Sequence, residues 1–270
     1  MKCGFIGLGS QGAPMAQAII DAGYETVLWA RRPESLEPYA DSGASFANSV
    51  RELGEQVQFC GICVVDDNGV RQVCDELIPA MAAGGCIAIH STVHPQLCRE
   101  LAAAAHERGL YLVDAPVSGG GSAAADKTLT VMVGGSEEAL ATMRPVFETF
   151  SGLLIHLGDV GAGQMAKLVN NSMMAANLAI AHQSLAAAAA LGVDREAFIQ
   201  LVKVSSGRSF AFDVGSRIGK PTDFAHGARM LNKDVGLLGE ALGEDPSYPL
   251  IHDTAQAFLQ AALQDPQDAG

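Results

Sequence analysis

The chain has 270 residues, 49% of them hydrophobic, and 30 acidic against 17 basic residues give it a formal net charge of -13. This length allows one or two domains with buried cores, and the apolar content excludes an intrinsically disordered protein. The acidic balance disfavours nucleic acid as a partner, because binding to phosphates requires neutralisation by lysine and arginine.

Short apolar segments alternate with amphipathic ones through the first 160 or so residues. Strand-like segments lie at 2–7, 25–30, 57–65, 85–90, 110–116 and 129–135, and helical spacing of apolar residues appears at 10–23, 69–81 and 94–109. Strands that alternate with helices favour right-handed crossovers and a mostly parallel sheet covered on both faces. We therefore predict an α/β fold class, with a doubly wound, Rossmann-type domain at residues 1–160.

The alternation stops near residue 160. From Gln164 onward the patterns are helical, with a long alanine- and methionine-rich helix to about Leu191, another from about Asp194 and more beyond Asn232. We predict a second, all-α domain at residues 161–270, built on the long central helix. Its polar end, 264–270, has a composition typical of a disordered tail.

The cysteines and the longest apolar stretch indicate in which cellular compartment the protein is expected. All six cysteines precede residue 99, and only Cys60 and Cys63 form a C-x-x-C pair. Side chains three apart on an apolar strand point to opposite faces, which favours buried free thiols over a metal or redox site. Free thiols and the lack of a basic, apolar leader indicate the cytoplasm. Polar residues such as Asn177 and His182 interrupt the stretch 173–193, which predicts a buried helix and no membrane partner.

The first strand-like segment runs into a glycine pattern. Gly7, Gly9 and Gly12 form G-x-G-x-x-G between this strand and the first helix. Such glycines allow a tight turn, the approach of a pyrophosphate and close helix packing, while the helix N-terminus offers N–H groups to the anion. We predict a dinucleotide site that also includes Ser10 and Gln11; a merely tight strand-to-helix turn is the alternative.

The end of the second strand bears on the choice of cofactor. NAD-selective sites usually place a carboxylate there for the ribose 2'-hydroxyl, but this chain has Ala30 followed by Arg31 and Arg32. Two guanidinium groups suit a 2'-phosphate, so we predict NADP, with NAD possible. The alternative is a pair of solvated surface arginines.

Several motifs in order resemble the β-hydroxyacid dehydrogenase family, which includes 3-hydroxyisobutyrate dehydrogenases, tartronate semialdehyde and glyoxylate reductases and 6-phosphogluconate dehydrogenases. The resemblance covers nearly the whole chain and implies that the domain at residues 161–270 serves substrate binding and dimerisation. It rests on GFIGLGSQGAPMA from Gly4, STVHP from Ser91, DAPVSGG from Asp114, GAGQMAKLVNN from Gly161 and LNKD from Leu231.

The resemblance implies that Lys167 is the general acid or base on the reacting oxygen. Asn171, four residues further on the same helix face, would hold the lysine and the substrate. Proton transfer near neutral pH needs a lysine of lowered pKa, which an apolar helix and the positive nicotinamide ring would provide. In isolation, a lysine on an alanine-rich helix is more often an exposed residue with its stem on apolar surface.

The same resemblance assigns further binding residues. The turn at Ser118, Gly119 and Gly120 offers a hydroxyl and N–H groups to the substrate carboxylate, although a flexible glycine loop is the alternative. Thr92 would lie near the cofactor ribose, or would cap the next helix, or both. Val65, after a strand in a loop that lacks the proline often found in the family, is a further predicted cofactor contact.

Lys233 corresponds to a family lysine in the active-site cleft and is predicted to contact substrate and cofactor. Asp234 beside it could instead form a local ion pair. The segment 204–217 matches no substrate-defining signature, so the family implies the reaction class without naming the substrate.

The function predicted from the sequence is an NADP-dependent oxidoreductase that interconverts a small 3-hydroxy acid and its semialdehyde or ketone, with no metal. One alternative is an imine reductase-like enzyme, although such enzymes commonly replace the lysine. The other is a non-catalytic, cofactor-binding interaction module.

The helix at about 163–191 is apolar on nearly every side, and a small helical domain has limited capacity to cover such a helix. A second subunit would cover the remaining apolar surface, so we predict a homodimer or homotetramer.

Overall fold

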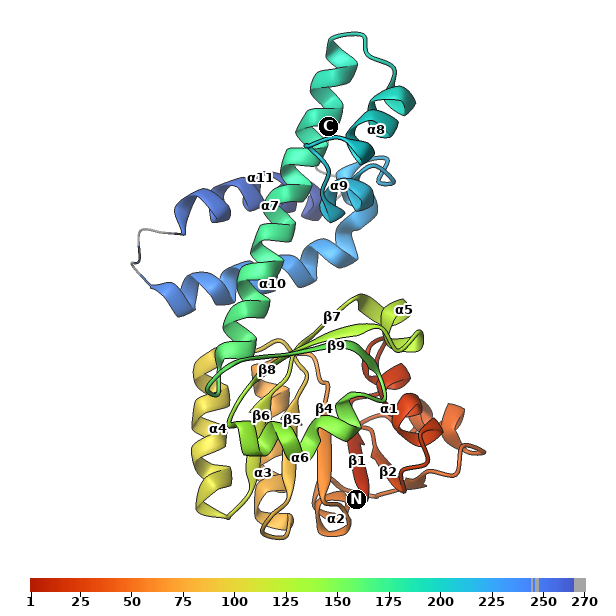
Figure 1. Cartoon of the computed structure of the whole chain (residues 1–270), viewed down its shortest axis with the longest axis vertical. Coiled ribbons are helices and arrows are strands. Elements are labelled where there is room, and N and C mark those ends of the chain that lie inside the picture. Colours follow the sequence, from red (N-terminus) through yellow and green to blue (C-terminus); the bar gives the residue numbers. More distant parts are fainter. Residues whose placement is uncertain (244, 246–247, 265–270) are drawn as a thin grey trace. The chain divides into compact units, whose positions relative to one another are not determined.

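The computed structural model describes residues 1–243, 245 and 248–264 of the chain. The chain divides into two compact units, a first unit of Met1–Lys167 and a second unit of Leu168–Gly270 (Figure 1). Apart from Gln264, the tail for which disorder is predicted lies outside the described residues.

A nine-stranded sheet, counted over the described residues, forms the centre of the first unit. Its order is β3-β2-β1-β4-β5-β6-β8-β7, and β9 pairs with β8. The set from β3 to β6 is parallel, β8 is antiparallel to β6 and β7, and β9 is parallel to β8. The strands are β1 (Cys3–Ile6), β2 (Thr26–Trp29), β3 (Ser45–Phe46), β4 (Phe59–Ile62), β5 (Cys86–Ile89), β6 (Tyr111–Asp114), β7 (Val117–Ser118), β8 (Leu129–Gly134) and β9 (Ser151–Gly158).

Helices cover both faces of this sheet, as the predicted doubly wound fold requires (Figure 1). The neighbours Phe59 and Cys60 of β4 belong to different apolar clusters, because successive side chains of a strand point to opposite faces. One cluster takes in α1 and α6, and the other takes in α2, α3 and α4. The helical segments are α1 (Gly12–Asp21), η1 (Pro33–Tyr39), α2 (Val50–Gln56), α3 (Asp67–Ala80), α4 (Pro95–Glu107), α5 (Gly120–Ala125) and α6 (Glu137–Phe147).

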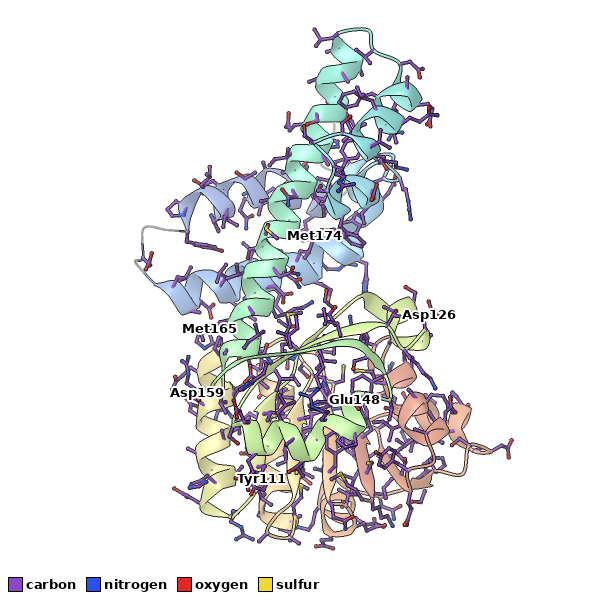
Figure 2. All side chains as sticks on the ribbon, viewed as in Figure 1. Tyr111, Asp126, Glu148, Asp159, Met165 and Met174 are labelled. Atoms are coloured by element: carbon purple, nitrogen blue, oxygen red, sulfur yellow. The ribbon has the colours of Figure 1, made fainter. Side chains whose placement is uncertain are left out.

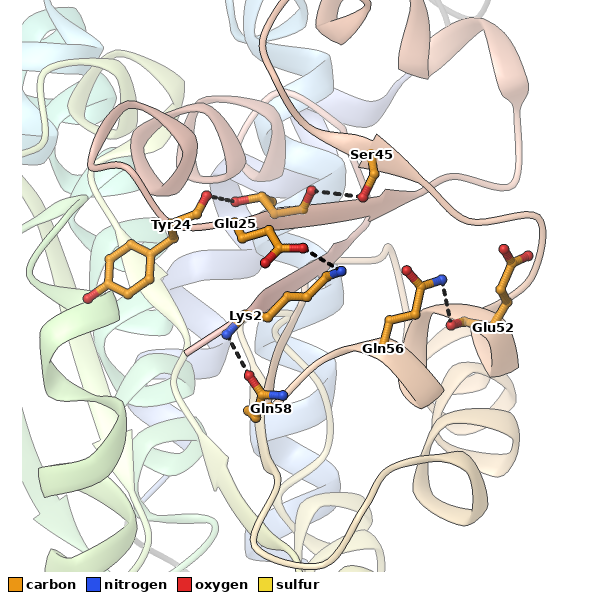
Figure 3. A network of polar contacts seen from close by, with 8 residues as sticks. Lys2, Tyr24, Glu25, Ser45, Glu52, Gln56 and Gln58 are labelled. Carbon is orange, nitrogen blue, oxygen red and sulfur yellow. Dashed lines mark hydrogen bonds and ion pairs between the residues drawn. The ribbon is translucent and has the colours of Figure 1, made fainter.

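Polar contacts tie the amino ends of the strands together (Figure 3). The ammonium group of Lys2 lies 2.6 Å from a carboxylate oxygen of Glu25, and its backbone N–H donates to Gln58 Oε1 at 2.6 Å. Thr26 Oγ1 donates to the carbonyl of Tyr24 at 2.9 Å. Structural contacts therefore occupy this end of the sheet, and a binding site is expected at the carboxyl ends of the strands.

The second unit is all-α in its described residues and is built on α7, so the predicted fold class is confirmed. Its core joins α7, α10 and α11 through side chains such as Leu178, Val235 and Phe258. The sequence prediction missed α9 and η2 and began the later helices too late, since α10 starts at Ala225. The helical segments are α7 (Ala162–Ala190), whose residues up to Lys167 belong to the first unit, α8 (Arg195–Val204), α9 (Phe210–Gly215), η2 (Pro221–Phe224), α10 (Ala225–Leu242) and α11 (Pro249–Leu263).

The cysteines are free thiols, as predicted. Burial raises the pKa of both Cys63 and Cys74 to about 12, which makes them poor nucleophiles and poor metal ligands at neutral pH.

None of the helices in the described part of the chain has the length and apolar character needed to cross a membrane.

Candidate active site

A cavity of about 520 Å³ lies at the carboxyl ends of β1, β2 and β4 in the first unit. The chain order of the strands reverses here, between β1 and β4, which is where open α/β sheets bind ligands. The wall includes Gly7 and Gly9 after β1, Arg31 and Arg32 after β2, and Val65 after β4. These predicted cofactor residues from three separate segments are thus brought to one cavity.

The glycines of the first turn differ in what they require. Gly7 has φ of +97°, and a Cβ there would lie 2.1 Å from the carbonyl oxygen of Cys63. A Cβ at Gly12 would lie 1.9 Å from the carbonyl oxygen of Gly7. At Gly9, by contrast, no described atom lies within 4 Å of such a Cβ. The packing of the turn explains Gly7 and Gly12, whereas Gly9 leaves open space of the kind that a pyrophosphate needs.

The N-terminus of α1 also fits an anionic ligand. Its cap, Gln11, makes no side-chain hydrogen bond to the helix, and the first turn carries no acidic residue. By comparison, α2 and α6 are each capped by a serine side chain and have glutamate in the first turn. The positive end of the α1 dipole is therefore left for a ligand that approaches Ser10 and Gln11.

Arg31 and Arg32, the two arginines after β2, are exposed to solvent and line the cavity. Arg31 Nη2 lies 3.5 Å from Gln72 Oε1, and Arg32 Nε lies 4.0 Å from a carboxylate oxygen of Glu34. The Arg32 side chain is 78% exposed, so this ion pair holds it weakly. Both guanidinium groups can therefore turn toward a phosphate at little cost.

The turn after β7 packs closely against the glycine-rich turn that follows β1. Ser118 ends β7, and Gly119 and Gly120 follow with φ of +131° and +73°. A Cβ at Gly121 would lie 2.8 Å from the carbonyl oxygen of Ser10, which fixes how closely the two turns approach. The hydroxyl and amides predicted to hold a carboxylate therefore lie beside the predicted dinucleotide site.

A buried carboxylate fastens the start of α7 to the sheet. Asp114 Oδ1 accepts a hydrogen bond from the Gly161 N–H at 2.6 Å, and Oδ2 accepts one from the Gln164 N–H at 2.7 Å. Burial raises the pKa of Asp114 to about 6, although these amide donors act in the opposite direction. The sequence prediction assigned no role to Asp114 or Gln164. The signal that could have pointed to them is that a charged residue, Asp114, and a polar residue, Gln164, lie within apolar segments.

The segment after β5 is held from two sides. Ser91 Oγ accepts from the Val64 N–H at 2.8 Å, and Gln164 bonds to both Ser91 and Val93. The prediction that Thr92 caps the next helix is wrong, because the cap of α4 is His94, whose Nδ1 accepts from the Gln96 N–H at 3.1 Å.

The remaining predicted residues lie on α7 and α10. Lys167 is buried, so the alternative of an exposed lysine is wrong. Asn171 Nδ2 donates to Asp234 Oδ2 at 2.6 Å, and Lys233 Nζ lies 3.5 Å from Asp234 Oδ1, so the anticipated local ion pair is present. Asp234 thus brings Asn171 and Lys233 together within the second unit.

The described residues contain no group of three histidine, cysteine, aspartate or glutamate side chains arranged to hold a metal ion. His90 is the titratable side chain at the end of β5 and lies among phenylalanine rings, with Nδ1 donating to the Ala115 carbonyl at 2.8 Å. Burial lowers its pKa to about 4, so the ring is neutral and belongs to the core.

A doubly wound sheet with a glycine-rich strand–turn–helix at its switch point defines a dinucleotide-binding protein. Residues 2–158 match the family model of the NAD-binding domain of 6-phosphogluconate dehydrogenase. Residues 161–270 match that of the NAD-binding domain of NADP-dependent 3-hydroxyisobutyrate dehydrogenase. The chain belongs to the β-hydroxyacid dehydrogenase family and is an NAD(P)-dependent oxidoreductase, which sets aside the non-catalytic module.

Individual relatives agree with this family. An NAD-dependent L-serine dehydrogenase of Pseudomonas aeruginosa is 36% identical over 96% of this chain and 91% of its own length. A solved 3-hydroxyisobutyrate dehydrogenase of Mycobacterium tuberculosis with L-serine has a TM-score of 0.88 at 28% identity and covers 98% of this chain and 96% of its own. A Streptomyces aurantiacus imine reductase, 20% identical with a TM-score of 0.67 over 97% of this chain and 94% of its own, shares the fold alone.

The contrast between Gly9 and Gly7 gives a test of the site. We expect Gly9→Ala to keep the unfolding free energy within about 1 kcal/mol of the parent, because the added methyl meets open space. It should weaken nicotinamide cofactor binding about tenfold or more, because the methyl takes the space of the pyrophosphate. Urea unfolding and fluorescence titration with NADPH and NADH measure both effects.

Two variants complete this test. Gly7→Ala should lower the unfolding free energy by about 2 kcal/mol or more, because the new Cβ meets backbone atoms at a positive φ. Gly236→Ala, on α10 with equally open surroundings, is the control that should leave cofactor affinity unchanged. Parent affinity in Gly9→Ala would mean that no cofactor approaches this turn.

Proposed function

We propose that the protein uses NADP to interconvert a small 3-hydroxy acid and its semialdehyde or ketone, with Lys167 as general acid and base. The observation that carries this proposal is the buried Lys167 on α7, four residues before an Asn171 whose amide is hydrogen-bonded to Asp234. Lys167 and Asn171 share one face of α7, and a buried titratable side chain is a candidate for a functional group.

The proposed chemistry assigns one task to each group. A bound nicotinamide supplies or accepts the hydride. During reduction, Lys167 Nζ donates a proton to the substrate carbonyl oxygen, and during oxidation it removes the hydroxyl proton. Asn171 and Lys233 hold the substrate, and the Ser118 hydroxyl with the amides after it binds the substrate carboxylate.

The names of the relatives narrow the proposed substrate. L-serine and 3-hydroxyisobutyrate both carry a hydroxymethyl group on the carbon that bears the carboxylate, and they differ in the third substituent, an ammonium or a methyl group. We therefore place 2-substituted 3-hydroxypropanoates first among the substrates to be tested, with a semialdehyde as product. An imine reductase-like activity is the alternative, disfavoured by Lys167, and a cyclic imine belongs in the same assay.

The catalytic assignment predicts that Lys167→Ala lowers kcat by roughly 10² to 10⁴, the usual contribution of general acid–base catalysis. Cofactor affinity should remain nearly intact, and Asn171→Ala should lose less activity. Lys203→Ala, which removes an exposed lysine of α8, is the matched control. Nicotinamide absorbance follows turnover, and near-normal turnover by Lys167→Ala on a confirmed substrate would refute the assignment.

The cofactor assignment predicts tighter binding of NADPH than of NADH. Charge-assisted contacts to the 2'-phosphate contribute about 1.5 to 3 kcal/mol, so removing both Arg31 and Arg32 should erase roughly tenfold or more of the preference. Arg51→Ala, on α2 and paired with Glu55, is the control. Isothermal titration measures each affinity; equal dissociation constants in the unmodified protein would favour the NAD-dependence named for the serine dehydrogenase relative.

We also propose that the protein is a homodimer or homotetramer. One stripe of α7 carries exposed apolar residues, with Val169, Met173 and Ile180 exposed by 48%, 53% and 54%. Met165, labelled near the start of α7, is exposed by 40% on the same stripe (Figure 2). Exposed apolar side chains that gather on one side of a helix support an interface with another chain.

The assembly should bury more than about 2,000 Å², the size class of obligate pairs. Light scattering at micromolar concentration is expected to return an even multiple of the 28.0 kDa chain mass. Val169→Asp should shift the distribution toward smaller species, whereas a monomer mass for the unmodified protein would disprove the proposal.

A further inference from the structure

The side chain of Gln164 pairs with both peptide groups that flank Thr92. Its Nε2 donates to the Ser91 carbonyl at 2.8 Å, and its Oε1 accepts from the Val93 N–H at 3.2 Å. The first of these groups belongs to the Ser91–Thr92 peptide and the second to the Thr92–Val93 peptide. One planar amide therefore fixes the backbone on both sides of Thr92.

This pairing is fully buried and specific to an amide. Gln164 has no exposed surface, so an unpaired atom in this place would cost the full desolvation of a polar group. Only asparagine and glutamine carry a donor and an acceptor side by side on one planar group, and glutamine has the longer reach.

Gln164 also connects two parts of the candidate site. On α7 the spacing of 164, 167 and 171 places Gln164 on the same helix face as Lys167 and Asn171. On the other side, Ser91 Oγ accepts from the Val64 N–H at 2.8 Å, and Val64 lines the cavity after β4. The clamped segment thus lies between the cavity wall and the first turns of α7, which carry Gln164 and Lys167.

We propose that Gln164 is a positioning residue that sets the placement of Thr92 relative to Lys167. This inference rests on the proposed function, because it gives the clamp a role in hydride transfer. The backbone N–H of Gln164 is held by Asp114 at 2.7 Å, so its side chain starts from a fixed point of α7. Loss of the side-chain clamp should therefore loosen the two peptide groups that flank Thr92 without releasing the helix.

The first experiment does not depend on turnover. In Gln164→Met, which keeps the length and apolar volume but neither hydrogen bond, amide exchange of Val93 followed by NMR should accelerate about tenfold or more. Thr26→Val is the matched control, because it removes a side-chain hydrogen bond from the buried Thr26 of β2 to the Tyr24 backbone carbonyl. Unchanged exchange at Val93 in Gln164→Met would overturn the clamp itself.

The second experiment tests the catalytic consequence. Gln164→Met should lower kcat about 30-fold or more and raise the isotope effect with cofactor deuterated at C4, because hydride transfer becomes limiting. Gln164→Glu keeps the acceptor for the Val93 N–H and should lie between parent and Gln164→Met. If Gln164→Met does not fold, Gln164→Glu replaces it as the test variant.

The outcomes separate the two proposals. Faster exchange at Val93 with parental kcat and isotope effect would make the clamp purely structural and overturn the inference. Normal turnover by Lys167→Ala would instead overturn the proposed function, while the exchange at Val93 would still decide whether Gln164 holds the Thr92 segment.

Discussion

The position of the longest helix depends on one buried carboxylate. Asp114 ends β6, the last strand of the parallel set from β3 to β6, and its two oxygens accept hydrogen bonds from the Gly161 and Gln164 amides, where the helix dipole favours a negative charge. The contact leaves no room for side chains, since a Cβ at Gly163 would lie 2.9 Å from Asp114 Oδ2 and one at Gly134 would lie 2.5 Å from Oδ1. A Cβ at Gly163 would also lie 2.4 Å from the Met132 carbonyl oxygen, so the Asp114 contact and the close packing of the backbone together require glycine at both positions.

The candidate residues of the first unit share a place in the fold. Gly7, Arg31, Val65, Thr92 and Ser118 lie at or just beyond the carboxyl ends of five different strands. Rigid, buried strands fix where each connecting segment begins, so short polar segments can present functional groups with little freedom. The opposite end of the sheet is closed by the ion pair and hydrogen bonds of its first residues, which leaves one end for binding (Figure 3).

The sequence predicts those features whose cause is local. Buried parallel strands appear as apolar runs, and the glycine-rich turn is contiguous, so the sheet and its first turn could be found. The two-residue strands β3 and β7 are too short to show a period, and α6 was missed although Ser136 and the glutamates after it are a helix-start signal. The contacts of Asp114 and Gln164 could not be predicted, because their partners lie 47 to 73 positions away. The chemical roles of the site residues remain predictions.

The short connection between β6 and β7 has an evolutionary consequence. Asp114 pairs with Gly134 on β8, and Ser118 pairs with Thr130 on the same strand, so both ends of this connection are fixed to one ladder. Because side chains alternate along a strand, an insertion of one residue would turn Ser118 to the other face of the sheet. A lineage that acquires a new substrate can therefore exchange residues in this span, but it cannot change their number. Descendants of this fold should diverge here by substitution, and should place their insertions and deletions elsewhere.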